Sequence, residues 1–156
     1  MKLKHATGVM VLLLVLTAGC NRKTLFNETV NLPAKGWSMN QFLTFEVPAG
    51  DTAQTYHLYL MVRNNARYAW SNLWLFVETH SPTGFMLRDT LEMRLADERG
   101  KWLGRGIGDR FAVEIPYRQW IRFPQTGTYR FEIHQGMRDT LLEHISEVGL
   151  RIEKSN

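Results

Sequence analysis

The chain has 156 residues, a formal net charge of +4 and 44% hydrophobic residues, with 12% aromatic residues. This composition excludes a disordered chain, and the length suits one domain with its own core. Basic residues alternate with acidic ones, as in the segments RDTLEMR and ADERGK, so the clustered positive surface of a nucleic-acid-binding protein is not expected.

The N-terminal segment has the parts of a secretory signal peptide in order. Lys2 and Lys4 precede an unbroken apolar run at residues 9–16, which is followed by three small residues. A membrane-spanning helix needs about 20 apolar residues, far more than this run supplies. We therefore expect residues 1–19 to be removed, which lowers the net charge from +4 to +2.

Cys20 is the only cysteine of the chain, and it directly follows the small residues in the segment LTAGC. This segment resembles a bacterial lipobox, in which cleavage falls just before a cysteine that carries a diacylglycerol unit. We therefore predict Cys20 to be the lipid-modified first residue of the mature chain. The alternative is an ordinary signal peptide with an incidental cysteine. A single thiol in either case excludes an internal disulfide.

The next segment, NRKTLFNETVNLPAKG at residues 21–36, has no strong hydrophobic pattern. We expect residues 20–36 to form a linker between the lipid and a folded domain at residues 37–156.

From residue 42 onward, apolar residues recur at a spacing of two, which predicts β-strands with one buried face. Turn signals separate these runs. We predict a single antiparallel β-sandwich of seven or eight strands, with a closed barrel as the competing architecture. The strands are expected within residues 42–47, 55–64, 73–77, 90–97, 110–115, 128–134 and 147–153.

Two segments depart from the simple alternation. The run LWLFV at residues 73–77 is apolar on both sides, which predicts a central strand covered on both faces. Residues 136–149 show helical spacing, which predicts one or two helical turns.

No motif indicates catalysis. The segment GRGIGD at residues 104–109 precedes a strand, whereas a phosphate-binding loop precedes a helix, so we expect a flexible hairpin or bulge. The histidines have no paired metal-ligand spacing, although His134, Asp139 and His144 could still be assembled in space. We therefore predict no enzymatic activity, no metal and no cofactor.

The tryptophans are the better functional candidates. Trp70 is expected in a loop, and polar residues flank Trp102 and Trp120, so these rings are candidates for contact with a protein partner or a glycan. Trp37 and Trp74 are expected in the core.

Three longer segments carry a resemblance to a known family. They are RNNARYAWSNLWLFVET, DTLEMRLADERGKWLGRGIGD and GTYRFEIHQGMRDTLLEHISEVGLRIE. Together they resemble the gliding-motility lipoprotein H family (GldH) of Bacteroidetes over residues 37–154. The chain has His144 where that family more often has glycine.

The resemblance implies a non-catalytic cell-envelope lipoprotein that is required for gliding and works beside the type IX secretion machinery. It implies that Cys20 is acylated and that the partners are the membrane and envelope proteins. Asn21, and the lack of an acidic run after Cys20, favour the periplasmic face of the outer membrane by analogy with other Gram-negative bacteria. The cytoplasmic membrane is the alternative location. The alternative function is a periplasmic glycan- or peptidoglycan-binding module.

Overall fold

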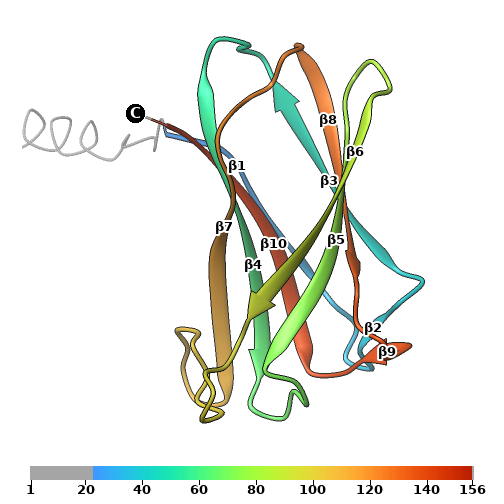
Figure 1. Cartoon of the computed structure of the whole chain (residues 1–156), viewed down its shortest axis with the longest axis vertical. Helices are drawn as coiled ribbons and strands as arrows, with labels where there is room; N and C mark the ends of the chain where they lie inside the picture. The colour runs from blue at the N-terminus through green and yellow to red at the C-terminus, as the bar shows by residue number, and fades with distance from the viewer. Residues whose placement is uncertain (1–22, 156) are drawn as a thin grey trace, which may run out of the picture.

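The computed structural model describes residues 23–155, which form an antiparallel β-sandwich (Figure 1). One sheet, the β4 sheet, has the order β1 (Thr24–Asn31), β10 (Ile145–Lys154), β4 (Thr55–Asn65) and β7 (Arg110–Arg122). The facing sheet, the β5 sheet, has the order β3 (Phe42–Ala49), β8 (Gly127–Gln135), β5 (Asn72–His80) and β6 (Met86–Arg94). A short third sheet pairs β2 (Trp37–Ser38) with β9 (Leu141–Leu142). The predicted all-β sandwich is confirmed.

No helix within residues 23–155 has the length and apolarity needed to cross a membrane.

The core lies between the two main sheets and follows the predicted alternation. Along β4 every second side chain is buried, and the intervening ones lie on the outer face. Phe26 of β1 and Phe45 of β3 meet edge to face at 6.3 Å between ring centroids, which joins the two sheets. The buried apolar residues of the central strands include Tyr56, Leu58, Leu60, Val62, Leu73, Leu75, Val77, Tyr129, Phe131, Ile133, Val148, Leu150 and Ile152.

The predicted domain boundary at residue 37 was wrong. Residues 24–31, expected in the linker, form the edge strand β1, which pairs with β10 from Thr24 opposite Glu153 to Asn31 opposite Glu147. The sequence signal is weak because half of the side chains of this edge strand are exposed, and Phe26 is its only buried one. Backbone hydrogen bonds to β10 therefore hold a segment whose side chains show little alternation.

The helical turns predicted at residues 136–149 were also wrong. This segment contains β9, a tight turn at His144 with φ of 69°, and the start of β10. Leu142 and Ile145 are both buried, but they lie on either side of that turn. Their spacing of three residues comes from the reversal of the chain and not from a helix.

β5 is central in its sheet, as predicted, because it lies between β8 and β6. Only one of its faces is covered, however. Trp37 is fully buried as expected, but Trp74 on β5 is 39% exposed, so its placement in the core was wrong. Within residues 23–155 the sandwich has two layers, and no third layer covers the outer face of β5 (Figure 1).

The two ends of the sandwich differ in what they carry. At one end, here called the Lys23 end, the described chain starts, and the carbonyl oxygen of Lys23 accepts a hydrogen bond from the Lys154 N–H at 2.7 Å. The loops at residues 50–54, 81–85 and 123–126 lie at this end, at the top of Figure 1. The loops at residues 66–71, 95–109 and 136–140 lie at the opposite end.

Candidate binding groove

A shallow groove of about 540 Å³ lies on the outer face of the β5 sheet, towards the end opposite Lys23. Its two tryptophans, Trp70 and Trp74, are 46% and 39% exposed. Rings of this size are normally covered in a stable fold, so their shared exposure marks a candidate contact surface. The groove is lined by Trp70, Asn72, Trp74, Phe76, Thr90, Gly136, Met137 and Arg138.

β5 supplies the floor of the groove. Trp74 and Phe76 are two residues apart and therefore point to the same face of the strand. The carbonyl oxygen of Trp74 accepts a hydrogen bond from the Gly136 N–H at 2.7 Å. A Cβ atom on Gly136 would lie 3.1 Å from the Phe76 ring and 3.2 Å from the Trp74 oxygen, so a side chain there would crowd the floor.

The loop at residues 66–71 supplies the wall that carries Trp70. The Asn65 side-chain oxygen accepts a hydrogen bond from the Arg67 N–H at 2.8 Å, and the Tyr68 hydroxyl donates to the Asn72 carbonyl at 3.0 Å. Burial, with a further contribution from Asp139, raises the pKa of Tyr68 above its ordinary value, so this hydroxyl stays protonated and able to donate. The RNNARY motif therefore fixes the loop instead of forming a reactive site.

Asp139 positions the Trp70 ring. The indole Nε1–H donates a hydrogen bond to Asp139 Oδ2 at 2.8 Å, which ties the loop at residues 66–71 to the loop at residues 136–140. On the rim, the Asn72 amide donates to Glu92 Oε1 at 2.6 Å. The groove thus combines exposed aromatic rings with polar groups that can orient a ligand.

The structure does not bring His134, Asp139 and His144 together. His134 lies against the Phe42 ring at 5.3 Å between centroids, and His144 Nδ1 is 3.3 Å from the Asn65 amide nitrogen. Asp139 holds Trp70. Among residues 23–155, the cluster of potential metal ligands consists instead of Glu78, His80 and Glu132.

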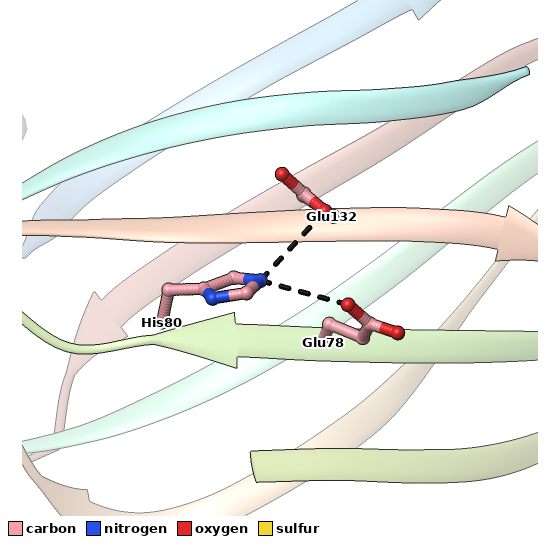
Figure 2. A group of neighbouring side chains, drawn as sticks. All are labelled: Glu78, His80 and Glu132. Carbon is pink, nitrogen blue, oxygen red and sulfur yellow. Dashed lines mark ion pairs between the residues drawn. The ribbon is translucent and has the colours of Figure 1, made fainter. Parts of the chain in front are cut away.

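This cluster lies on the same outer face, farther along β5 (Figure 2). Glu132 of β8 lies directly opposite Glu78, and His80 is two residues after Glu78 on the same face. His80 Nε2 lies 3.6 Å from Glu78 Oε2 and 3.7 Å from Glu132 Oε2. One imidazole nitrogen and two carboxylate oxygens are a donor set that a divalent transition metal accepts. No spacing in the sequence predicts this cluster, because only strand register brings residue 132 to residues 78 and 80.

Neighbouring arginines already neutralise both carboxylates. Arg88 Nε lies 3.5 Å from Glu78 Oε1, and Arg130 Nε lies 3.2 Å from Glu132 Oε1. Two like charges directly opposite each other in a sheet are destabilising, and these ion pairs offset that repulsion. The cluster is therefore explained as an ion-pair network across β6, β5 and β8.

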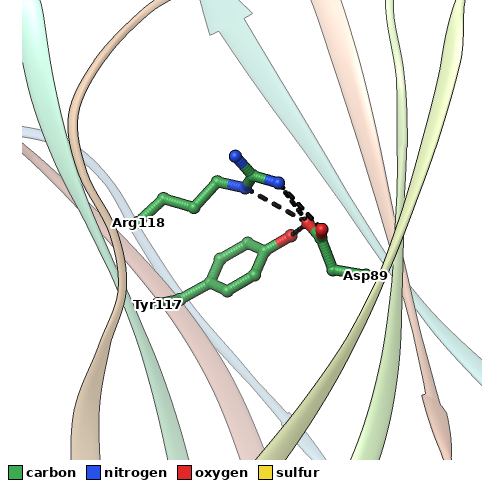
Figure 3. A network of polar contacts seen from close by, with 3 residues as sticks. All are labelled: Asp89, Tyr117 and Arg118. Atoms are coloured by element: carbon green, nitrogen blue, oxygen red, sulfur yellow. Dashed lines mark hydrogen bonds and ion pairs between the residues drawn. The ribbon is translucent and has the colours of Figure 1, made fainter.

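A second polar network joins the edges of the two sheets (Figure 3). Asp89 of β6 accepts hydrogen bonds from the Tyr117 hydroxyl and from the Arg118 guanidinium of β7, the latter at 2.8 Å. A bulge in β7 turns these consecutive side chains towards the same carboxylate. Burial, and then the hydrogen bond to Asp89, raises the pKa of Tyr117 to about 12.

The three tryptophans predicted as contact residues lie in three different places. Trp70 lines the groove. Trp102 is half-buried and stacks on Phe111 at 5.8 Å between ring centroids. Trp120 is 64% exposed at the Lys23 end and lies against the His57 ring at 4.5 Å.

The hairpin predicted at GRGIGD is present. The backbone groups of Arg105 and Ala112 exchange hydrogen bonds at 3.0 and 2.8 Å, which closes the turn before β7. Cys20, the predicted lipidation site, lies outside the described residues, so its modification stays a prediction.

The fold defines the class of protein. The described part of the chain is an antiparallel β-sandwich of two main sheets, with an aromatic groove on one open face. A family model described as GldH lipoprotein matches residues 24–152, and the chain belongs to this family. This confirms the resemblance drawn from the three sequence segments.

Two relatives match over their whole length. A protein of Christiangramia forsetii named gliding motility lipoprotein GldH homolog is 31% identical, with 100% of this chain and 99% of the relative aligned. A protein of Flavobacterium johnsoniae named gliding motility lipoprotein GldH is also 31% identical, with 100% of both chains aligned.

Solved structures give only weak likenesses. The tomato aspermy virus structure is 8% identical with a TM-score of 0.36, covering 97% of this chain and 94% of that one. Dimeric latent PorU from Porphyromonas gingivalis is 9% identical with a TM-score of 0.28, covering 90% of this chain and 14% of that one. Likenesses this weak carry no argument about function.

Proposed function

We propose that the chain is a lipid-anchored, non-catalytic adaptor of the cell envelope that binds an envelope protein of the gliding or type IX secretion apparatus. The single observation that carries this proposal is the groove, where exposed aromatic rings and polar side chains converge on one open sheet face. Tryptophan is enriched among the residues that dominate binding energy at protein interfaces.

The anchor part of the proposal is supported by the lone Cys20 in the segment LTAGC and by membership of a lipoprotein family. One acyl chain holds a protein at a membrane only marginally, whereas two or three hold it stably. A cysteine that carries a diacylglycerol and an acylated amine meets that requirement. Asn21 in place of an acidic residue supports a location at the periplasmic face of the outer membrane.

The adaptor part is supported by how the groove is built. Trp70 and Trp74 contribute little to the sandwich core, yet the Trp70 ring is fixed by its hydrogen bond to Asp139. A ring held in place while exposed loses little conformational entropy when a partner covers it, which favours binding. Mobile side chains on an ordinary surface would lose conformational entropy when a partner binds.

Cross-linking in living cells, followed by mass spectrometry, tests the adaptor role. The wild-type chain is compared with Trp74→Ala and with the matched variant Ile107→Ala, which removes a side chain that is 93% exposed in the hairpin at residues 104–109. We expect Trp74→Ala to reduce the cross-linked envelope protein at least several-fold, and Ile107→Ala to leave it unchanged. Circular dichroism of each purified variant checks the fold. Equal cross-linking of all three proteins would contradict the proposal.

The second candidate function is binding of a glycan or of peptidoglycan. It is favoured by the combination of two tryptophan faces, on which sugar rings stack, with Asn72, Thr90 and Arg138 as hydrogen-bonding groups in the same groove. A pull-down with peptidoglycan and a glycan array separates the two candidates. Saturable binding that is lost in Trp74→Ala and kept in Ile107→Ala supports the glycan candidate, and its absence supports the protein partner.

A further inference from the structure

The Lys23 end carries a group of exposed apolar side chains. Phe85 is 68% exposed at the tip of the hairpin between β5 and β6, and Met86 and Leu87 follow it with large exposed fractions. Trp120, 64% exposed, lies near the same end on β7. Its φ of 57° is unusual for a residue with a side chain.

An apolar hollow of about 460 Å³ continues from this hairpin between the edges of the two sheets. The apolar part of its wall is formed by Phe85, Leu87, Ile121 and Phe123. Arg122 also lines the hollow. The basic residues Lys23, Arg122 and Lys154 are exposed at strand ends across this end of the β4 sheet. Apolar and aromatic groups beside basic ones suit the boundary between lipid headgroups and acyl chains.

The short segment between Cys20 and Lys23 limits how far this end can lie from a bilayer that holds the lipid. Only Asn21 and Arg22 separate Cys20 from Lys23. A fully extended chain spans at most about 3.5 Å per residue, so Lys23 lies within roughly 10 Å of a lipid-modified Cys20. The headgroup layer on one side of a bilayer is itself several ångströms thick. A lipid on Cys20 would therefore hold the Lys23 end at the headgroups.

We propose that the Lys23 end of the sandwich rests on the bilayer, with Phe85, Met86 and Trp120 in the headgroup region. The inference rests on the proposed lipid anchor at Cys20. It deepens the proposed function. A nine-residue strand such as β5 is about 30 Å long, so the groove with Trp70 and Trp74, near its other end, is held away from the membrane. The anchor end and the groove end then have separate tasks.

The lone cysteine makes the test possible. When Cys20 is lipid-modified, a cysteine introduced elsewhere is the only free thiol of the mature chain. Phe85→Cys places that thiol at the Lys23 end, and Ile107→Cys places it in an exposed loop at the opposite end. Met86→Cys is a second variant at the Lys23 end in case Phe85→Cys folds poorly. Each lipidated protein is labelled with a polarity-sensitive fluorophore and reconstituted into vesicles of phosphatidylcholine with a minor share of phosphatidylglycerol.

We expect the label at residue 85 to shift to shorter wavelength on reconstitution and to be quenched several-fold more slowly by a water-soluble quencher. The label at residue 107 should keep its aqueous spectrum. Flotation of the vesicles tests the lipid anchor separately from the contact of the Lys23 end with the bilayer. If the protein does not float with the vesicles, both the lipid anchor and the contact of the Lys23 end with the bilayer are contradicted. If the protein floats but the label at residue 85 keeps its aqueous spectrum, the contact of the Lys23 end with the bilayer is contradicted and the anchor is not. Equal protection of both labels has the same meaning.

Discussion

Arg118 of β7 donates hydrogen bonds to both carboxylate oxygens of Asp89 on β6, and so joins edge strands that belong to different sheets (Figure 3). Tyr117 donates to the same carboxylate. This carboxylate is therefore a polar clasp between the two sheets, beside the packing of their buried side chains. It is also next to the apolar hollow at the Lys23 end, which Arg118 lines.

Asp89→Ala should lower the free energy of unfolding by about 2 kcal/mol, because hydrogen bonds to charged groups are lost and a partly buried guanidinium is left without its partner. Urea unfolding measures the loss. Glu98→Ala is the matched control, since it removes an exposed acidic side chain from a loop and should change stability by less than about 0.5 kcal/mol. A similar effect of both variants would show that the clasp is not stabilising.

Alkaline pH should weaken the clasp through Tyr117. Burial and the bond to Asp89 raise its pKa from 10.0 in the unfolded chain to about 12 in the folded one. A raised pKa contributes stability that is fully present below pH 10 and is lost as the pH rises through 12. The unfolding free energy of the wild type should therefore fall more steeply between these pH values than that of Tyr117→Phe. Parallel curves for the two proteins would contradict this.

The hairpin before β7 depends on a glycine for close approach. A Cβ atom on Gly106 would lie 1.6 Å from the Arg110 carbonyl oxygen, so Gly106→Ala must displace the backbone. We expect a loss of about 2 kcal/mol or more in thermal or urea unfolding. Gly50→Ala is the control, because a Cβ atom there meets nothing within 4 Å, and it should be close to neutral. The prediction fails if Gly106→Ala is as stable as Gly50→Ala.

His144 occupies the left-handed backbone region, with φ of 69°. Glycine adopts this backbone region without the steric cost of a Cβ atom. His144→Gly and His144→Ala remove the same imidazole, yet the glycine variant should be more stable by about 1 kcal/mol because only alanine keeps the strain of a Cβ atom. The neighbouring Glu143 is the control for the intrinsic preference, and there alanine should be the more stable of the two. Chemical unfolding of the four variants decides the order.

Cys20→Ser should abolish incorporation of a fatty-acid probe in living cells and leave a soluble or uncleaved chain, because the thiol is the atom to be alkylated. Asn21→Ser is the matched control and should keep the label. A Cys20→Ser chain that still carries the probe would show that lipid is attached elsewhere.

Much of the fold follows from local pattern. The alternation in residues 55–64 predicted which side chains of β4 are buried, because a strand sends successive side chains to opposite faces. Local pattern was insufficient for β1, where only one of the side chains that pair along β10 is buried. It was also misleading around His144, where a chain reversal imitates helical spacing.

By itself, the sequence determined the all-β class, the family, and the position of the lone cysteine after an apolar leader, because each of these depends on neighbours along the chain. Only the tertiary structure decided that Trp74 is exposed beside Trp70, and that Glu132 lies opposite Glu78. Whether an apolar ring is buried depends on whether a second layer covers its face, and which side chains meet depends on register between distant strands. Neither property is contained in the spacing of residues within one strand.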